Sequence, residues 1–236
     1  KETLFALHRH LGISRCVIVQ SACHGYDNRV VEDAIAHGGG RYLGVALVPL
    51  SVERTELQRL AAAGFRAIRF NFMKHLNTGA SVEDVVALTP MLAELGMHLQ
   101  IHFESALIHS LGPVLQQSAC PVVIDHMGRV DAALGREGAD FQALLRLLEQ
   151  PLFYVKVSGI DRIDATPPYQ HGIARAQELV AHAPDRVLWG SDWPHPNHTH
   201  VPDDGVLVDA LARFSPNPAP LQALLVDNPQ QGLQMR

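Results

Sequence analysis

The stretches Ala67-Ile68-Arg69-Phe70-Asn71-Phe72 and Leu99-Gln100-Ile101-His102-Phe103 decide the fold. In each, polar and apolar residues alternate, which is typical of a β-strand with two unlike faces. Central strands of an open doubly wound sheet are buried on both faces and read as continuous apolar runs. A polar strand face inside an α/β protein instead indicates a barrel whose interior opens at the carboxyl ends of its strands.

Outward from these two strands, helix and strand patterns alternate along the chain. The predicted strands are 16–20, 44–48, 67–72, 99–103, 122–126, 154–158 and 187–192. The predicted helices are 4–11, 28–37, 51–63, 81–95, 108–117, 141–148, 173–180, 206–214 and 221–226. Gly38 to Gly40 follow a helix and therefore end it, and Pro90 must kink or divide the helix that contains it.

This alternation predicts right-handed crossovers, a parallel sheet and a (β/α)₈ TIM-type barrel of the α/β class. The sequence pattern predicts only seven strands, and its first predicted element is a helix. We therefore expect that the first strand of the barrel is missing from the given chain. Residues 1–236 would then form a single barrel domain that is incomplete at its amino end.

Composition excludes several classes of protein. The chain has 236 residues, 47% of them apolar, and a net charge of −5 without a long basic run. This charge disfavours a nucleic-acid or membrane-surface partner. Three cysteines without C-x-x-C spacing predict neither a disulfide framework nor a cysteine zinc site. Because no secretion signal or membrane-spanning run is legible, we expect a cytoplasmic protein.

Polar residues gather at the predicted carboxyl ends of the strands, which meet at one mouth of a barrel. They are Gln20, Cys23, His24, Arg69, Asn71, His102, Glu104, Asp125, His126, Lys156, Ser158 and Asp192. Asp192 could bind a metal, take a proton from water, or cap the following turn. His126 could polarise a substrate carbonyl, or it could be a structural imidazole.

Positive charge also concentrates near this mouth, although the whole chain is acidic. Arg69, Arg129 and Arg162 are the arginines concerned. Because guanidinium groups bind carboxylates with two parallel hydrogen bonds, they favour an anionic substrate with carboxyl groups. The alternative is that they pair with nearby acids such as Asp131 and Asp161.

Two groups among the 14 histidines resemble metal sites. His8-Arg9-His10 lies in a predicted helix, where residues two apart point in different directions, so we expect it at the solvated surface. His195, His198 and His200 follow the last strand in a loop rich in Pro and Asn. They are candidates for lining the mouth, and a solvated loop is at least as good a prediction for the last two.

Five motifs, in this order along the chain, resemble the amidohydrolase superfamily, in particular its 2-pyrone-4,6-dicarboxylate lactonase family. They are QSACHG at 20–25, RFNF at 69–72, VIDHMGR at 123–129, KVS at 156–158 and LWGSDWPHP at 188–196. The resemblance covers nearly the whole chain. It implies a distorted (β/α)₈ barrel that hydrolyses a lactone ring in the breakdown of lignin-derived aromatic acids.

The resemblance also implies roles for individual residues. Asp192 resembles the general base that activates water, and His126 resembles the hydrogen-bonding partner of the lactone carbonyl. Arg69 and Arg162 resemble clamps on the substrate carboxylates. The remaining expected substrate-binding residues are His24, Asn71, His75, His102 and Arg129. In lactonases of this family the reaction proceeds without a divalent metal, so no cofactor is expected.

The chain departs from the family pattern at three places. The H-x-H pair of the family's first strand is absent, His75 stands where an arginine is expected, and His102 stands where an aromatic hydroxyl is expected. His102 and Asp192 could therefore contribute to a divalent metal site, for example for zinc. The leading hypothesis is a hydrolase of small carboxylated lactones. The alternatives are a metal-dependent hydrolase or decarboxylase, and an inactive barrel that binds small acids.

Overall fold

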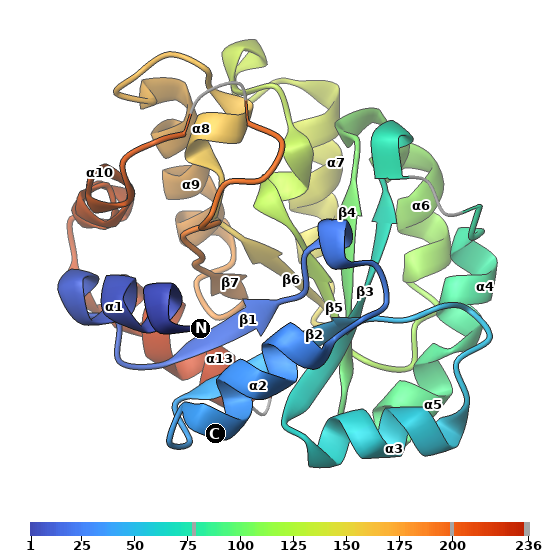
Figure 1. The fold of residues 1–236 in the computed structure, drawn as a ribbon. Coiled ribbons are helices and arrows are strands. Elements are labelled where there is room, and N and C mark those ends of the chain that lie inside the picture. Colours follow the sequence, from blue (N-terminus) through green and yellow to red (C-terminus); the bar gives the residue numbers. More distant parts are fainter. Residues whose placement is uncertain (77–78, 199–200, 234–236) are drawn as a thin grey trace.

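The computed structural model describes residues 1–76, 79–198 and 201–233. Its centre is a parallel sheet of seven strands that are hydrogen-bonded in chain order (Figure 1). The strands are β1 (Cys16–Val19), β2 (Tyr42–Leu47), β3 (Phe65–Phe72), β4 (His98–Phe103), β5 (Val122–Ile124), β6 (Phe153–Lys156) and β7 (Val187–Leu188). A strand order that never reverses is that of a barrel, and this confirms the predicted fold class. Within the described residues, no ladder joins β1 to β7.

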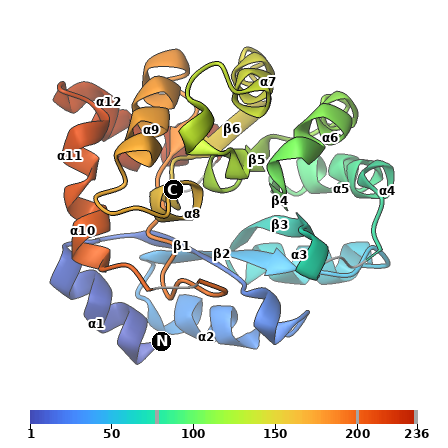
Figure 2. The same cartoon turned by 90° about the horizontal axis from the view of Figure 1, so that it is seen from above.

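The helices surround the curled sheet, as the view from above shows (Figure 2). They are α1 (Glu2–Leu11), α2 (Arg29–His37), α3 (Arg54–Ala62), α4 (Val82–Ala87), α5 (Thr89–Glu94), α6 (Ile108–Leu115), α7 (Ala139–Leu148), α8 (Ile160–Ile163), α9 (Gln170–His182), α10 (Asp204–Asp209), α11 (Leu211–Phe214), α12 (Pro218–Gln222) and α13 (Asn228–Gly232). As predicted, Gly38 ends α2, and Pro90 lies in the first turn of α5, where the predicted long helix is divided. None of the described helices is both long and apolar enough to cross a membrane.

The apolar core lies between the outer face of the sheet and the helices. Ile68, Leu99 and Ile101 are completely buried on the strands, and Leu57 and Leu92 are buried on the facing helices. Burying each such side chain stabilises the fold by about 1.5–3 kcal/mol relative to leaving it exposed. This core holds the opposite, polar faces of the strands toward the inside of the curled sheet.

The register of the sheet aligns those polar faces. Arg69 pairs with Gln100, and Asn71 pairs with His102, across β3 and β4. Because parallel strands in register place paired residues side by side on one face, the four polar side chains form two layers. The alternation in the sequence predicted this arrangement.

Two predicted strands are shorter than expected at the end that carries polar residues. β5 ends at Ile124 and β7 ends at Leu188, whereas the sequence predicted strands to His126 and Asp192. Both of these later residues have a positive φ, 48° for His126 and 66° for Asp192. This left-handed conformation breaks an extended strand and turns the chain away from the sheet.

The predicted surface position of His8 is wrong. Its side chain is buried between α1 and β2, and its Nδ1 lies 3.0 Å from the hydroxyl of Tyr42. Arg9 and His10 are exposed, as expected. An amphipathic helix buries one face, and His8 lies on that face with Leu4 and Leu11 one turn away on either side.

Candidate active site

Asp125, which follows β5, joins polar groups from three other strands. Its carboxylate accepts hydrogen bonds from Arg69 Nε at 2.8 Å and Gln100 Nε2 at 2.9 Å, and Lys156 Nζ lies 3.1 Å away. Burial opposes ionisation of Asp125, but the charges of Lys156 and Arg69 outweigh it and hold its pKa well below the usual range. The carboxylate is therefore ionised and fixes both cations inside the sheet.

His126 and Asp192 face each other, as the resemblance implied. Nε2 of His126 lies 3.7 Å from Oδ1 of Asp192, and both side chains are about nine-tenths buried. Nδ1 of His126 lies 3.0 Å from the hydroxyl of Ser158, which follows β6. Burial lowers the pKa of His126 to about 4, although Asp192 opposes the shift. The imidazole is thus neutral at pH 7 and carries one proton.

His102 lies beside this pair. Its ring makes an edge contact with that of His126, with 5.2 Å between the centroids. Its Nδ1 lies 3.2 Å from Oδ1 of Asn71, and because an amide oxygen only accepts, Nδ1 carries the proton. Burial, together with His126 and Arg69, lowers the pKa of His102 to about 2. Its Nε2 is therefore a lone-pair acceptor that has no hydrogen-bond partner among the described residues.

The arginines pair with acids other than those considered from the sequence. Arg69 binds Asp125, and Nε of Arg162 donates to Oδ2 of Asp192, rather than to Asp131 or Asp161. Nη2 of Arg162 also donates to the carbonyl of Pro196 at 2.9 Å. Burial opposes ionisation of Asp192, but His126, His198 and Arg162 outweigh it, so its pKa lies well below the usual range.

Arg129 completes the positive charge around Asp192. It ends the left-handed turn 126–129 and is partly buried. Burial and the nearby Arg162 lower its pKa, while Asp192 and Asp161 oppose the shift. Arg129 and Arg162 thus act on the same carboxylate that faces His126.

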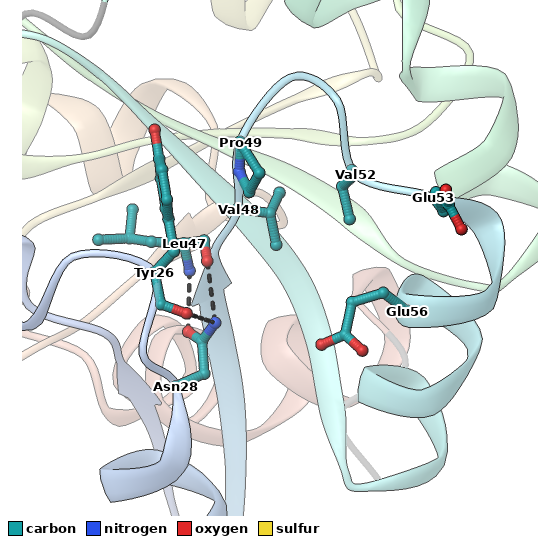
Figure 3. A pocket seen from close by; sticks show the side chains of 8 residues that line it. All are labelled: Tyr26, Asn28, Leu47, Val48, Pro49, Val52, Glu53 and Glu56. Atoms are coloured by element: carbon teal, nitrogen blue, oxygen red, sulfur yellow. Dashed lines mark hydrogen bonds between the residues drawn. The ribbon is translucent and has the colours of Figure 1, made fainter.

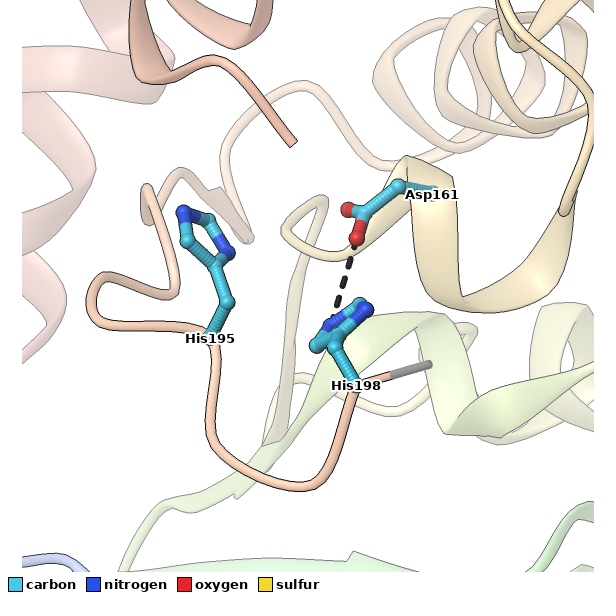
Figure 4. Close-up of side chains that lie close together, drawn as sticks. All are labelled: Asp161, His195 and His198. Carbon is cyan, nitrogen blue, oxygen red and sulfur yellow. Dashed lines mark ion pairs between the residues drawn. The ribbon is translucent and has the colours of Figure 1, made fainter. Parts of the chain in front are cut away.

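His195 and His198 form a second cluster with Asp161 of α8 (Figure 4). Nε2 of His198 lies 3.2 Å from Oδ2 of Asp161 and 3.7 Å from Oδ2 of Asp192. The side chains of His198 and Asp161 are 5% and 0% exposed, so the predicted solvated position of His198 is wrong. His200, the third histidine of this loop, lies outside the described residues.

Two of the predicted substrate-binding residues do not join the polar groups. His24 and His75 are exposed, in the segments that follow β1 and β3. Within the described residues, no hydrogen bond or ion pair connects either of them to Asp192 or His126. They stay predictions for contacts with a bound substrate.

A cavity of about 320 Å³ lies beside the end of β2 (Figure 3). Its lining residues are Tyr26, Asn28, Leu47, Val48, Pro49, Val52, Glu53 and Glu56. None of them belongs to the polar groups described above. Two glutamates in the lining would repel an acidic substrate, so this cavity does not suit the anionic ligand that the arginines favour.

The predicted metal pair does not fit a divalent ion. A catalytic zinc site generally takes three protein ligands, and the group of three close metal-binding side chains found among the described residues contains neither His102 nor Asp192. Arg162 occupies one oxygen of Asp192, and the charges of Arg69 and Arg129 act on His102. A divalent cation at this position would lie among these positive charges.

The contacts of some site residues could not be predicted from the sequence. Asp125 and Ser158 were among the polar residues at the predicted strand ends, but the sequence predicted no hydrogen-bond or ion-pair partner for either. Asp161 was considered only as a partner for an arginine. Each becomes important through contacts with residues at least 25 positions away along the chain, and spacing alone does not show such contacts.

Two curated proteins with similar sequences are lactone hydrolases. The 2-pyrone-4,6-dicarboxylate hydrolase of Comamonas testosteroni is 40% identical over 98% of this chain and 79% of its own length. A 4-sulfomuconolactone hydrolase of Hydrogenophaga intermedia is 38% identical over 94% of this chain and 75% of its own length.

Solved structures show the same fold. One described as a 2-pyrone-4,6-dicarboxylic acid hydrolase from Pseudomonas putida has a TM-score of 0.89 and 31% identity, covering all of this chain and 87% of that one. A zinc-bound amidohydrolase from Burkholderia multivorans shares the fold at a TM-score of 0.77 and 18% identity, covering all of this chain and 88% of that one. The model of the family described as amidohydrolase matches residues 2–232, so this chain belongs to the amidohydrolase family.

Proposed function

We propose that this protein hydrolyses the lactone ring of a small carboxylated substrate, such as 2-pyrone-4,6-dicarboxylate or a related lactone. The observation that carries the proposal is the 3.7 Å approach of His126 Nε2 to Asp192 Oδ1, beside two buried arginines. The similarity to pyrone and sulfomuconolactone hydrolases supports the same reaction class.

In the proposed reaction, Asp192 takes a proton from water while the water oxygen attacks the lactone carbonyl carbon. The bond between this carbon and the ring oxygen then breaks, and the ring oxygen receives the proton from Asp192. His126 donates a hydrogen bond from Nε2 to the carbonyl oxygen, where negative charge develops. The hydroxyl of Ser158 supports this tautomer because it donates to Nδ1.

The arginines serve as the binding groups for the substrate carboxylates. Arg162 is held by Asp192, and Arg129 lies beside it. When a substrate carboxylate shares the guanidinium of Arg162, Asp192 loses part of the interaction that lowers its pKa. We therefore infer that substrate binding itself makes Asp192 a stronger base.

We propose that ring opening uses no metal at His102 and Asp192. The surrounding cations support this, and His126 already provides the polarising group. His102, whose Nδ1 is held by Asn71, instead accepts a hydrogen bond at Nε2 from the attacking water.

The substitution Asp192→Asn tests the proposal. It keeps the shape of the side chain but removes the base, so kcat for ring opening should fall by about 10²–10⁴-fold. Loss of ultraviolet absorbance on ring opening measures this rate, and circular dichroism checks the fold. Asp209→Asn, at an exposed position of α10, is the matched control and should keep the wild-type rate. A near wild-type rate for Asp192→Asn would contradict the assignment.

A substrate panel tests the substrate class. We expect turnover of 2-pyrone-4,6-dicarboxylate or of a carboxylated muconolactone, and much weaker turnover of the corresponding methyl esters, which cannot pair with the arginines. Turnover of the pyrone dicarboxylate would show that His75 replaces the expected arginine. Equal rates for acids and esters would rule out the arginine clamps.

A further inference from the structure

Asp161 is a buried acidic side chain with few polar contacts. Its side chain is completely buried, and neither of its oxygens has a hydrogen-bond partner among the described residues. Nε2 of His198 lies 3.2 Å from Oδ2 of Asp161. An ionised carboxylate in such surroundings needs a compensating cation or strong hydrogen bonds.

His195 is oriented in the manner of a metal ligand. Its Nε2 lies 3.0 Å from Oδ1 of Asp204, and its Nδ1 is buried without a hydrogen-bond partner in the described part of the chain. Histidines that bind metals generally donate the hydrogen of one ring nitrogen to a carboxylate, which leaves the other nitrogen as the ligand. The pairing with Asp204 therefore prepares Nδ1 of His195 to bind an ion.

We propose that Asp161, His195 and His198 form a binding site for a divalent transition metal, with zinc as the ion that suits the donors best. One ligand atom from each residue lies within 4.8 Å of the other two (Figure 4). Atoms bound to one zinc ion lie about 3–4 Å apart, so shifts of about an ångström close the site. Two imidazoles and one carboxylate are a ligand set of known zinc sites, which leave a further position for water.

The local charge favours an ion here more than at His102. Three carboxylates, those of Asp161, Asp192 and Asp204, lie around the two histidines. The two neighbouring arginines, Arg129 and Arg162, supply two positive charges. The three carboxylates therefore leave an excess of one negative charge. At His102 the neighbouring arginines have no comparable excess of acids.

The site would connect two segments that carry the proposed catalytic groups. Asp161 precedes Arg162 in α8, and His195 and His198 follow Asp192 in the loop after β7. A bound ion would fix this loop to α8 next to the ion pair between Arg162 and Asp192. The inference does not depend on the proposed reaction, because ion binding is measurable without substrate.

The test is a metal-binding measurement on the full chain. Protein freed of metal by chelation is titrated with Zn²⁺ in competition with a chromophoric chelator, and Co²⁺ absorption reports the coordination geometry. We expect one equivalent of Zn²⁺ in the wild type. Asp204→Asn should weaken binding by about 10–100-fold, and Asp161→Asn and His198→Ala by more.

Two control variants locate the ion. His109→Ala removes an exposed histidine that lies 2.8 Å from Asp140, and it should leave Zn²⁺ affinity unchanged. His102→Ala should also leave it unchanged. Loss of binding in His102→Ala but not in His198→Ala would overturn the inference, and so would failure of the wild type to bind one equivalent. Circular dichroism of each variant separates lost binding from lost fold, and the near-isosteric Asp161→Asn serves if His198→Ala does not fold.

Discussion

At the scale of single residues, Asp192 and Ser158 together favour the tautomer of His126 that carries its proton on Nε2. The hydroxyl of Ser158 lies 3.0 Å from Nδ1, and burial keeps the imidazole neutral. A neutral imidazole has one donor and one acceptor nitrogen, so a hydroxyl that donates to Nδ1 leaves the hydrogen on Nε2. Nε2 is the nitrogen that faces Asp192.

We therefore expect Ser158→Ala to lower kcat by about tenfold. The substitution removes one hydrogen bond of about 1–1.5 kcal/mol, so the tautomer of His126 with its proton on Nδ1 becomes more populated. KM should change little, since the contact of Ser158 is with Nδ1 of His126 and not with the nitrogen that we assign to the substrate. Steady-state kinetics measure both constants. Ser110→Ala, at an exposed hydroxyl, is the control, and equal effects of the two substitutions would argue against the role of Ser158.

At the scale of elements, α8 and α9 approach so closely that only glycine fits between them. A Cβ atom on Gly172, in the first turn of α9, would lie 2.5 Å from the carbonyl oxygen of Ile160. This neighbour is backbone, so it cannot move without moving α8. Because α8 carries Asp161 and Arg162, the packing of these two helices positions part of the site.

Gly172→Ala should therefore destabilise the protein by about 1–3 kcal/mol, the usual cost of overpacking, and should also lower kcat/KM. Urea unfolding and steady-state kinetics measure the two effects. Gly112→Ala in α6 is the matched control, because the nearest atom to its added Cβ lies 3.9 Å away. This control should be neutral or stabilising by about 0.5–1 kcal/mol, and similar losses in both variants would contradict the packing argument.

At the scale of the whole molecule, buried histidines make stability depend on pH. Burial lowers the pKa of His98 to about 3, of His102 to about 2 and of His126 to about 4, from an ordinary value of 6.5. Below pH 6.5 the unfolded chain binds protons that the folded chain does not bind, so acid favours unfolding. Asp125 and Asp192, whose pKa values are also lowered, add to this loss only below about pH 4.

Stability should therefore fall as the pH decreases from 6.5 to 4.5, with a slope of at most about 4 kcal/mol per pH unit from the three histidines. Between pH 7.5 and 8.5 the slope from these histidines should be less than about 0.5 kcal/mol per pH unit. Urea unfolding at a series of pH values measures the effect. His98→Leu should reduce the slope by up to about one third, and an unchanged slope in this variant would contradict the assignment to the buried histidines.

Much of the fold could be predicted because its signals are local. Alternation in 67–72 and 99–103 identified strands with a polar face, and glycines and Pro90 marked the helix ends. The helix α8 was not predicted, because it has only four residues and no periodic pattern. The ends of β5 and β7 were predicted too far along the chain. His126 and Asp192 adopt a left-handed conformation, which cannot be predicted from their residue types.

By itself, the sequence determined the class of fold, the set of polar residues at the strand ends and the resemblance that paired Asp192 with His126. These follow from periodicity and motifs, which are properties of neighbouring residues. Only the tertiary structure decided which of these polar residues contact one another. It placed Asp125 between Arg69 and Lys156, and it buried His198 against Asp161. The physical reason is that charge compensation in a buried site depends on distances between groups far apart in the chain, and the packing of strands and helices sets those distances.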